Sequence, residues 1–249
     1  MTRPGAPLRW ASIAALTVVL GACSSTSSSE PGPGQRELFP TVFAASSLTD
    51  AFGGINQALA HQGSKATFSF AGSQALVAQI ANGAPADVIA TADATTMSTV
   101  ASHLVAPAQV FARNRLVIVT ARGNPHRVTS LSDLANPKLA VVLADPTVPA
   151  GKYAAQALAA AHVTVHPKSL ELEVRSVLTK VELGEADAGI VYATDALAGE
   201  GKVTAVPLAG GPVASYEIGA VDNAGRAFVR FVLSAPGQSV LQHFGFLPP

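Results

Sequence analysis

The sequence is poor in cysteine and in charge, and each shortage excludes a class of protein. Cys23 is the only cysteine, so an intrachain disulfide is excluded. Charged residues make up 13% of the chain, and its 16 basic and 16 acidic side chains leave no net charge. Because a nucleic-acid partner requires a clustered basic face, this composition argues against one. The six histidines show no metal-ligand spacing, so we expect them at the surface.

The apolar run from Trp10 to Leu20 is shorter than the roughly 20 residues of a membrane-spanning helix. Arg3 and Arg9 precede the run, which is typical of an export signal. It ends in Leu20-Gly21-Ala22-Cys23, a sequence that resembles the lipobox cut by lipoprotein signal peptidase. We therefore predict a signal peptide over 1–22 and lipidation of Cys23, which would hold the protein on the extracytoplasmic face of the cell membrane.

The stretch that follows Cys23 is rich in serine, glycine and proline (SSTSSSEPGPGQ), a composition typical of a flexible linker. Such a stretch cannot build a pocket, so a buried or catalytic thiol at position 23 is disfavoured against the lipid attachment. We predict a lipidated tether over 23–37 and a folded part that follows it.

Apolar strands alternate with segments of helical period through the folded part, which indicates an α/β fold with mainly parallel strands. One such segment places Leu48, Phe52, Ile55 and Leu59 on a single helical stripe. Strands are predicted at 87–92, 116–121, 139–145 and 188–192, and helices at 173–183 and in the closing segment.

Serines stand at two predicted strand-to-helix turns, at Ser47 and at Ser73. Serine is a common helix N-cap, so a purely structural role is the simpler interpretation of each one alone. A helix start also leaves backbone N–H groups unpaired and carries partial positive charge, so it can hold an anion without any basic side chain. In open α/β sheets, ligands bind where strands end and helices begin.

Five segments, in order along the chain, resemble the molybdate-binding proteins of ABC importers. They are Ala44-Ala45-Ser46-Ser47-Leu48-Thr49, Gly83-Ala84-Pro85-Ala86-Asp87-Val88, Asp145-Pro146 through Val148-Pro149-Ala150-Gly151-Lys152-Tyr153-Ala154, Val174-Arg175, and Gly189-Ile190-Val191-Tyr192-Ala193-Thr194-Asp195-Ala196. The resemblance implies a two-lobed periplasmic-binding-protein fold of type II. Each lobe would be a mostly parallel sheet flanked by helices, with the ligand in the cleft between lobes. We expect lobe 1 over 38–113 and 220–249, and lobe 2 over 114–219.

Carried over from that family, the ligand would be held by the hydroxyls and amides of Ser47 and Ser73, the amides of Ala150 and Val174, and the phenol of Tyr192. Gly72 departs from the pattern, because relatives often have a further serine there. The resemblance implies a monomeric, non-enzymatic binding protein without a cofactor, which delivers molybdate, and tungstate with it, to a membrane permease. Arg175 is expected to be solvated or ion-paired. We expect Tyr153 and Tyr216 to pack, and Asp87 and Asp145 are candidates to cap neighbouring helix starts.

Two alternatives stay open at this point. The first is a receptor for another anion, such as sulfate or a small carboxylate, although a carboxylate receptor should offer an arginine for bidentate capture. The second is an extracytoplasmic hydrolase with Ser47 or Ser73 as nucleophile. Neither serine lies in a G-x-S-x-G elbow, and no histidine has a recognisable partner motif, which disfavours the enzyme.

Overall fold

The computed structural model describes residues 39–249, so the predicted signal peptide, Cys23 and the tether lie outside the described residues. The strands are β1 (Thr41–Ala45), β2 (Thr67–Ala71), β3 (Val88–Thr91), β4 (Gln109–Ala121), β5 (Val141–Ala144), β6 (Ser169–Glu171), β7 (Ala188–Tyr192), β8 (Val203–Pro207) and β9 (Val213–Ala220). The α-helices are α1 (Thr49–Ala60), α2 (Ser73–Ala81), α3 (Ala94–Ser98), α4 (Pro149–Ala160), α5 (Val174–Glu182), α6 (Ala193–Ala198), α7 (Arg226–Leu233) and α8 (Ala235–His243). Within this range no helix is both long and apolar enough to cross a bilayer.

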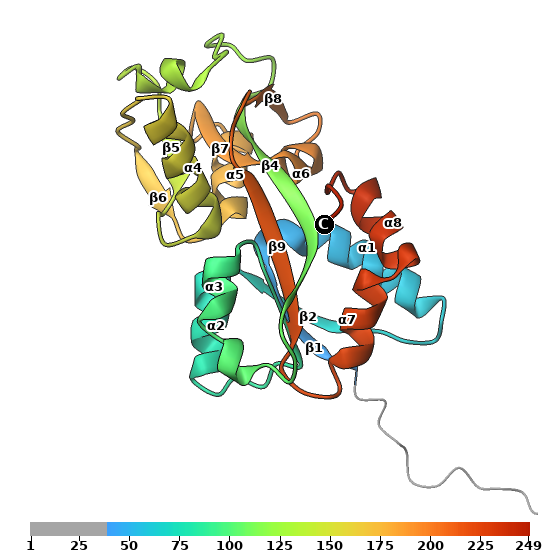
Figure 1. Ribbon diagram of the computed structural model, residues 1–249. Helices are drawn as coiled ribbons and strands as arrows, with labels where there is room; N and C mark the ends of the chain where they lie inside the picture. Colours follow the sequence, from blue (N-terminus) through green and yellow to red (C-terminus); the bar gives the residue numbers. More distant parts are fainter. Residues whose placement is uncertain (1–38) are drawn as a thin grey trace, which may run out of the picture. The chain divides into compact units, whose positions relative to one another are not determined.

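The strands form a mixed sheet in the order β2-β1-β3-β9-β4-β7-β5-β6, with β8 paired to β4. Strands β1, β2 and β3 pair in parallel, as do β5, β6 and β7. We call the first three strands with α1, α2, α3, α7 and α8 the first lobe, and β5 to β8 with α4, α5 and α6 the second lobe (Figure 1). The predicted two-lobed α/β fold is confirmed.

Strands β4 and β9 connect the lobes and pair antiparallel to their neighbours. Strand β4 pairs with β9 up to Arg115, with β7 from Leu116 and with β8 from Val117, so it passes from one lobe to the other at this point. Strand β9 pairs with β3 and with the Gln109–Arg115 part of β4. The lobe boundaries at 113/114 and 219/220 stay a prediction.

Helix α1 shows how the apolar pattern fixes the first lobe. The predicted stripe of Leu48, Phe52, Ile55 and Leu59 is buried, and the Phe52 ring packs against Phe228 of α7 with centroids 5.6 Å apart. A short 3-10 turn over Ser46–Leu48 connects β1 to α1, so Ser47 lies in this turn and not inside the helix. The packing of α1 therefore holds the serine turn at the carboxyl end of β1.

Candidate anion-binding site

The turns at the carboxyl ends of six strands, three in each lobe, contribute to one small cavity. Its lining comprises Ala45, Ser46, Ser47, Ala71, Gly72, Ser73, Ala92, Val148, Pro149, Ala150, Val174 and Tyr192. The cavity is small, and none of these side chains carries a charge at neutral pH. All five residues predicted to hold the ligand are therefore brought together, from segments up to 145 positions apart between Ser47 and Tyr192.

Helix starts supply backbone N–H groups to this cavity. Ser73 and Val174 are the first residues of α2 and α5, and Ala150 is the second residue of α4, directly after Pro149. N–H groups at these positions have no acceptor one turn earlier in their own helix. Three amides and the positive ends of three helix dipoles therefore meet at one place, which favours a bound anion.

The two serine hydroxyls add donors beside these amides. Ser73 Oγ accepts a hydrogen bond from the Ala92 amide at 3.1 Å, and no atom within residues 39–249 accepts the Ser73 hydroxyl proton. Ser47 Oγ lies 2.9 Å from the phenolic oxygen of Tyr216. Both serines are buried, with 3% and 1% of Ser47 and Ser73 exposed. Each hydroxyl can therefore donate to a ligand without losing the contact that orients it.

Tyr192 carries a buried hydroxyl that lacks a partner. The residue is 1% exposed, and its phenolic oxygen makes no hydrogen bond in the part of the chain that the structure describes. Burial raises the pKa of this phenol well above its usual value, so the group keeps its proton. Since a buried hydroxyl without a partner costs about 1–3 kcal/mol, a ligand that accepts from it would recover that cost.

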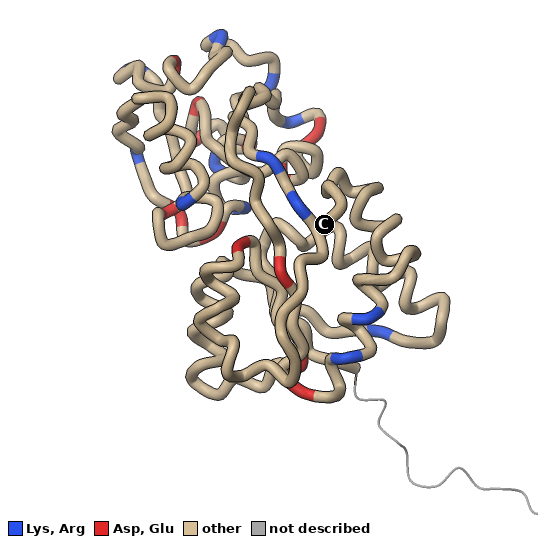
Figure 2. The backbone as a smooth tube through the Cα atoms, in the orientation of Figure 1, with Lys and Arg blue, Asp and Glu red and all other residues tan. Residues whose placement is uncertain are grey.

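Charged groups surround the cavity in pairs and do not line it. Arg175, next to Val174, contacts Asp195 of its own lobe at 2.8 Å and Asp50 of the first lobe, so of the two expected states it is the ion-paired one. Burial raises the pKa of Asp195 to about 6, although the Arg175 guanidinium opposes this shift. The sparse charges elsewhere are scattered over both lobes (Figure 2).

Two further contacts join the lobes beside the cavity. Lys152 of α4 pairs with the largely buried Asp93, the N-cap of α3, at 2.7 Å. The side-chain amide of Gln74 donates to the carbonyl oxygen of Leu172 at 2.8 Å. Together with the contact between Arg175 and Asp50, these contacts hold the two sides of the cavity against each other.

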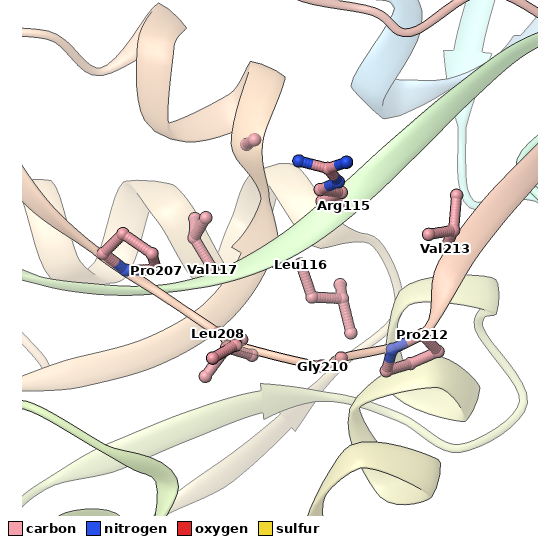
Figure 3. A pocket seen from close by; sticks show the side chains of 11 residues that line it. Arg115, Leu116, Val117, Pro207, Leu208, Gly210, Pro212 and Val213 are labelled. Carbon is pink, nitrogen blue, oxygen red and sulfur yellow. The ribbon is translucent and has the colours of Figure 1, made fainter.

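A larger hollow of about 540 Å³ lies beneath the loop that joins β8 to β9 (Figure 3). It is lined mostly by apolar and glycine residues, including Leu116, Leu208, Gly210 and Pro212, with Arg115 as its one charged side chain. The small cavity at the helix starts has the converging donors that this hollow lacks, so we place the candidate site there.

Some side chains behave differently from the expectation. Asp87 accepts a hydrogen bond from the Thr41 amide at 2.6 Å, so it ties the start of β1 and caps no helix. Asp145 accepts from the amide and hydroxyl of Thr147 in the turn before α4, whose N-cap is Val148, so the capping prediction is wrong here too. Tyr216 packs as predicted, but its hydrogen bond to Ser47 was missed, because no local pattern brings together residues 169 positions apart.

Tyr153 and the histidines lie where the sequence predicts. The phenol of Tyr153 accepts from the Ser215 amide at 3.4 Å and does not line the cavity. Every histidine is exposed: His61, His103, His126, His162, His166 and His243. No cluster of potential metal-ligating side chains occurs between residues 39 and 249.

Comparison with known proteins gives matches along almost the whole folded part. The family model described as bacterial extracellular solute-binding protein matches residues 40–247. The protein named molybdate-binding protein ModA of Mycobacterium tuberculosis is 41% identical over 95% of this chain and 95% of its own length. Such proteins are binding proteins and not enzymes.

Solved structures share the fold at lower identity. The periplasmic molybdate-binding protein of Azotobacter vinelandii has a TM-score of 0.70 and 19% identity, over 84% of this chain and 99% of that one. The sulfate-binding protein SubI of Mycobacterium tuberculosis has a TM-score of 0.73 and 19% identity, over 84% and 86%. At this identity the fold is shared by receptors for different oxyanions, so the fold alone does not choose the ligand.

Proposed function

This chain belongs to the bacterial extracellular solute-binding proteins, and we propose that it captures molybdate outside the cytoplasm for an ABC importer. The observation that carries the proposal is the uncharged cavity with converging donors: the helix-start amides of Ser73, Ala150 and Val174, the hydroxyl of Ser47, and the unpartnered phenol of Tyr192. The 41% identity to a protein named for molybdate binding supports the same ligand. No cofactor is required.

The choice between oxyanions follows from the donor-only lining. Molybdate at neutral pH is a tetrahedral dianion without a proton, so donors alone satisfy its oxygens. Hydrogen phosphate carries a proton that needs an acceptor, and the cavity has no carboxylate in its lining. Burying that proton unpaired would cost about 1–3 kcal/mol, which favours rejection of phosphate.

Sulfate and tungstate are distinguished by size and not by charge. Sulfate is also a fully deprotonated dianion, but it is smaller, so several donor-to-oxygen distances would exceed good hydrogen-bond geometry. Tungstate has nearly the size of molybdate, so we propose that the protein binds both. Sulfate binding is the alternative function, because a sulfate-binding protein shares this fold.

We further propose that binding closes the lobes about the crossing strands β4 and β9. Ser47 and Ser73 belong to the first lobe, while Ala150, Val174 and Tyr192 belong to the second, so one ion gripped by all five favours the closed arrangement. The closed, monomeric protein would deliver the ion to a membrane permease. Lipidation of Cys23, predicted from the lipobox, would keep it at the outer face of the cell membrane.

A thermal-unfolding comparison tests the ligand. Molybdate and tungstate at about 1,000 times their dissociation constants should each stabilise the protein by about 4 kcal/mol and raise Tm by roughly 10 °C. Sulfate and phosphate at the same concentration should raise Tm far less. A shift with sulfate and none with molybdate would assign the protein to the sulfate receptors.

Removing single side-chain donors tests the site. Tyr192→Phe and Ser47→Ala each delete one hydroxyl from a buried dianion, and each should weaken molybdate binding by roughly 1.5–3 kcal/mol in calorimetric titration. Tyr153→Phe is the matched control, because this tyrosine does not line the cavity. Wild-type affinity in both site variants would show that the ion is held elsewhere.

A further inference from the structure

Tyr216 connects ligand residues of both lobes although it does not line the cavity itself. It lies on the connecting strand β9 and is fully buried. Its phenolic oxygen is 2.9 Å from Ser47 Oγ in the first lobe. Its ring meets the ring of Tyr192, from the second lobe, with centroids 5.6 Å apart and planes at 64°. One side chain thus contacts a proposed ligand residue on each side.

The direction of the hydrogen bond between Tyr216 and Ser47 follows from what each group must do. A fully deprotonated oxyanion can only accept, so the single hydroxyl proton of Ser47 goes to the ligand. Ser47 Oγ then needs a donor on its other side, and Tyr216 is the group within hydrogen-bond distance. Burial raises the pKa of Tyr216 well above its usual value, so this phenol has a proton to give.

We infer that Tyr216 is a positioning residue that donates to Ser47 and so fixes the Ser47 hydroxyl as a donor to the bound oxyanion. The inference rests on the proposed function and deepens it. In the free protein either hydroxyl can donate its proton to the other oxygen, because both groups can donate and accept. Bound oxyanion selects one orientation, and hydrogen bonds aligned in a chain strengthen one another.

A purely structural role is the competing interpretation, because Tyr216 also packs against other rings. Its centroid lies 5.3 Å from that of Phe246 and 6.2 Å from that of Phe111. Tyr216→Phe keeps the ring and its contacts and deletes only the hydroxyl, so it separates the two roles. Tyr153→Phe is the control. The Tyr153 phenol of α4 accepts a hydrogen bond from Ser215, the neighbour of Tyr216 on β9, and makes no hydrogen bond to Ser47.

Calorimetric titration with molybdate should show a loss of roughly three- to tenfold in affinity for Tyr216→Phe and none for Tyr153→Phe, given the size of one hydrogen bond. The decisive measurement is the affinity of the double variant that carries both Tyr216→Phe and Ser47→Ala, compared with the two single variants. If Tyr216 acts through Ser47, adding Tyr216→Phe to Ser47→Ala should change the affinity less than about twofold. An equal loss in both backgrounds would assign Tyr216 a structural role and overturn the inference.

A spectroscopic reading keeps the test decisive if Tyr216→Phe does not fold. The chain has three tyrosines, so labelling with 3-fluorotyrosine gives three fluorine resonances, which Tyr153→Phe and Tyr192→Phe assign. Saturating molybdate should shift the Tyr216 resonance in the otherwise unchanged chain, and Ser47→Ala should at least halve that shift while the Tyr192 shift persists. A Tyr216 shift unaffected by Ser47→Ala would overturn the inference.

The outcomes also separate this inference from the proposed function. If the unchanged protein binds molybdate and Tyr216→Phe binds it equally well, only the positioning role is wrong. If the unchanged protein binds no molybdate in the titration, the proposed function fails and the positioning role fails with it.

Discussion

Val174→Pro should weaken molybdate binding by about tenfold to a hundredfold while the protein stays folded. Val174 is the first residue of α5, where proline fits because the backbone N–H has no partner in the helix. The preceding Glu173 has φ of −154° and ψ of 152°, within the range that a residue before proline adopts. The substitution therefore removes one backbone donor and leaves the helix in place.

The size of this effect follows from the charge of the ligand. Hydrogen bonds to charged groups contribute about 1.5–3 kcal/mol, which corresponds to about tenfold or more in affinity. Val174→Ala is the matched control, because it keeps the amide and shortens the side chain, which is 3% exposed. Calorimetric titration of both variants checks the prediction. Equal affinity in the proline and alanine variants would show that the Val174 amide does not hold the ion.

Gly72→Ala should also reduce molybdate affinity strongly, through the approach of the two lobes. A Cβ at position 72 would overlap the carbonyl oxygen of Leu172 in the second lobe. Because that oxygen belongs to the backbone, the clash is relieved only if the lobes separate or the loop shifts. Overpacking of this kind costs about 1–3 kcal/mol, so we expect a loss of about fivefold to a hundredfold in titration.

Gly53→Ala is the control for this substitution. Position 53 lies inside α1, and a Cβ added there would meet no atom within 4 Å, so alanine should leave affinity unchanged and stabilise the protein by roughly 0.5–1 kcal/mol. Wild-type affinity in Gly72→Ala would show that Gly72 and Leu172 are not in close contact when molybdate is bound. In this structure the missing Cβ of Gly72 leaves room for the carbonyl oxygen of Leu172.

The sequence predicts most of the fold because its local patterns are strong. The stripe of Leu48, Phe52, Ile55 and Leu59 forms one buried face, and the strand predicted at 188–192 coincides with β7. The place where the chain returns from the second lobe to the first was harder to predict. Strand β9 pairs with β3 and β4, which lie far away in the chain, and a pairing of this kind leaves no local periodicity that identifies its partner.

The residues of the candidate site also fall into those that local sequence patterns predict and those that they do not. Ser47 and Ser73 are visible in the sequence because their side chains have chemistry at predicted helix starts. Ala150 and Val174 contribute through backbone N–H groups, which every residue except proline has, so only the resemblance to a family could select them. The contact of Tyr216 with Ser47 was found only in the structure, because it depends on how β9 lies against the first lobe.

Anomalous diffraction from crystals grown with molybdate tests the central claim most directly, because it locates molybdenum without reference to any expected ligand. We predict one strong molybdenum peak, in the cavity lined by Ser47, Ser73, Ala150, Val174 and Tyr192, with no peak in the hollow beside Arg115. A molybdenum peak at another place, or none in that cavity at saturating molybdate, would contradict the account.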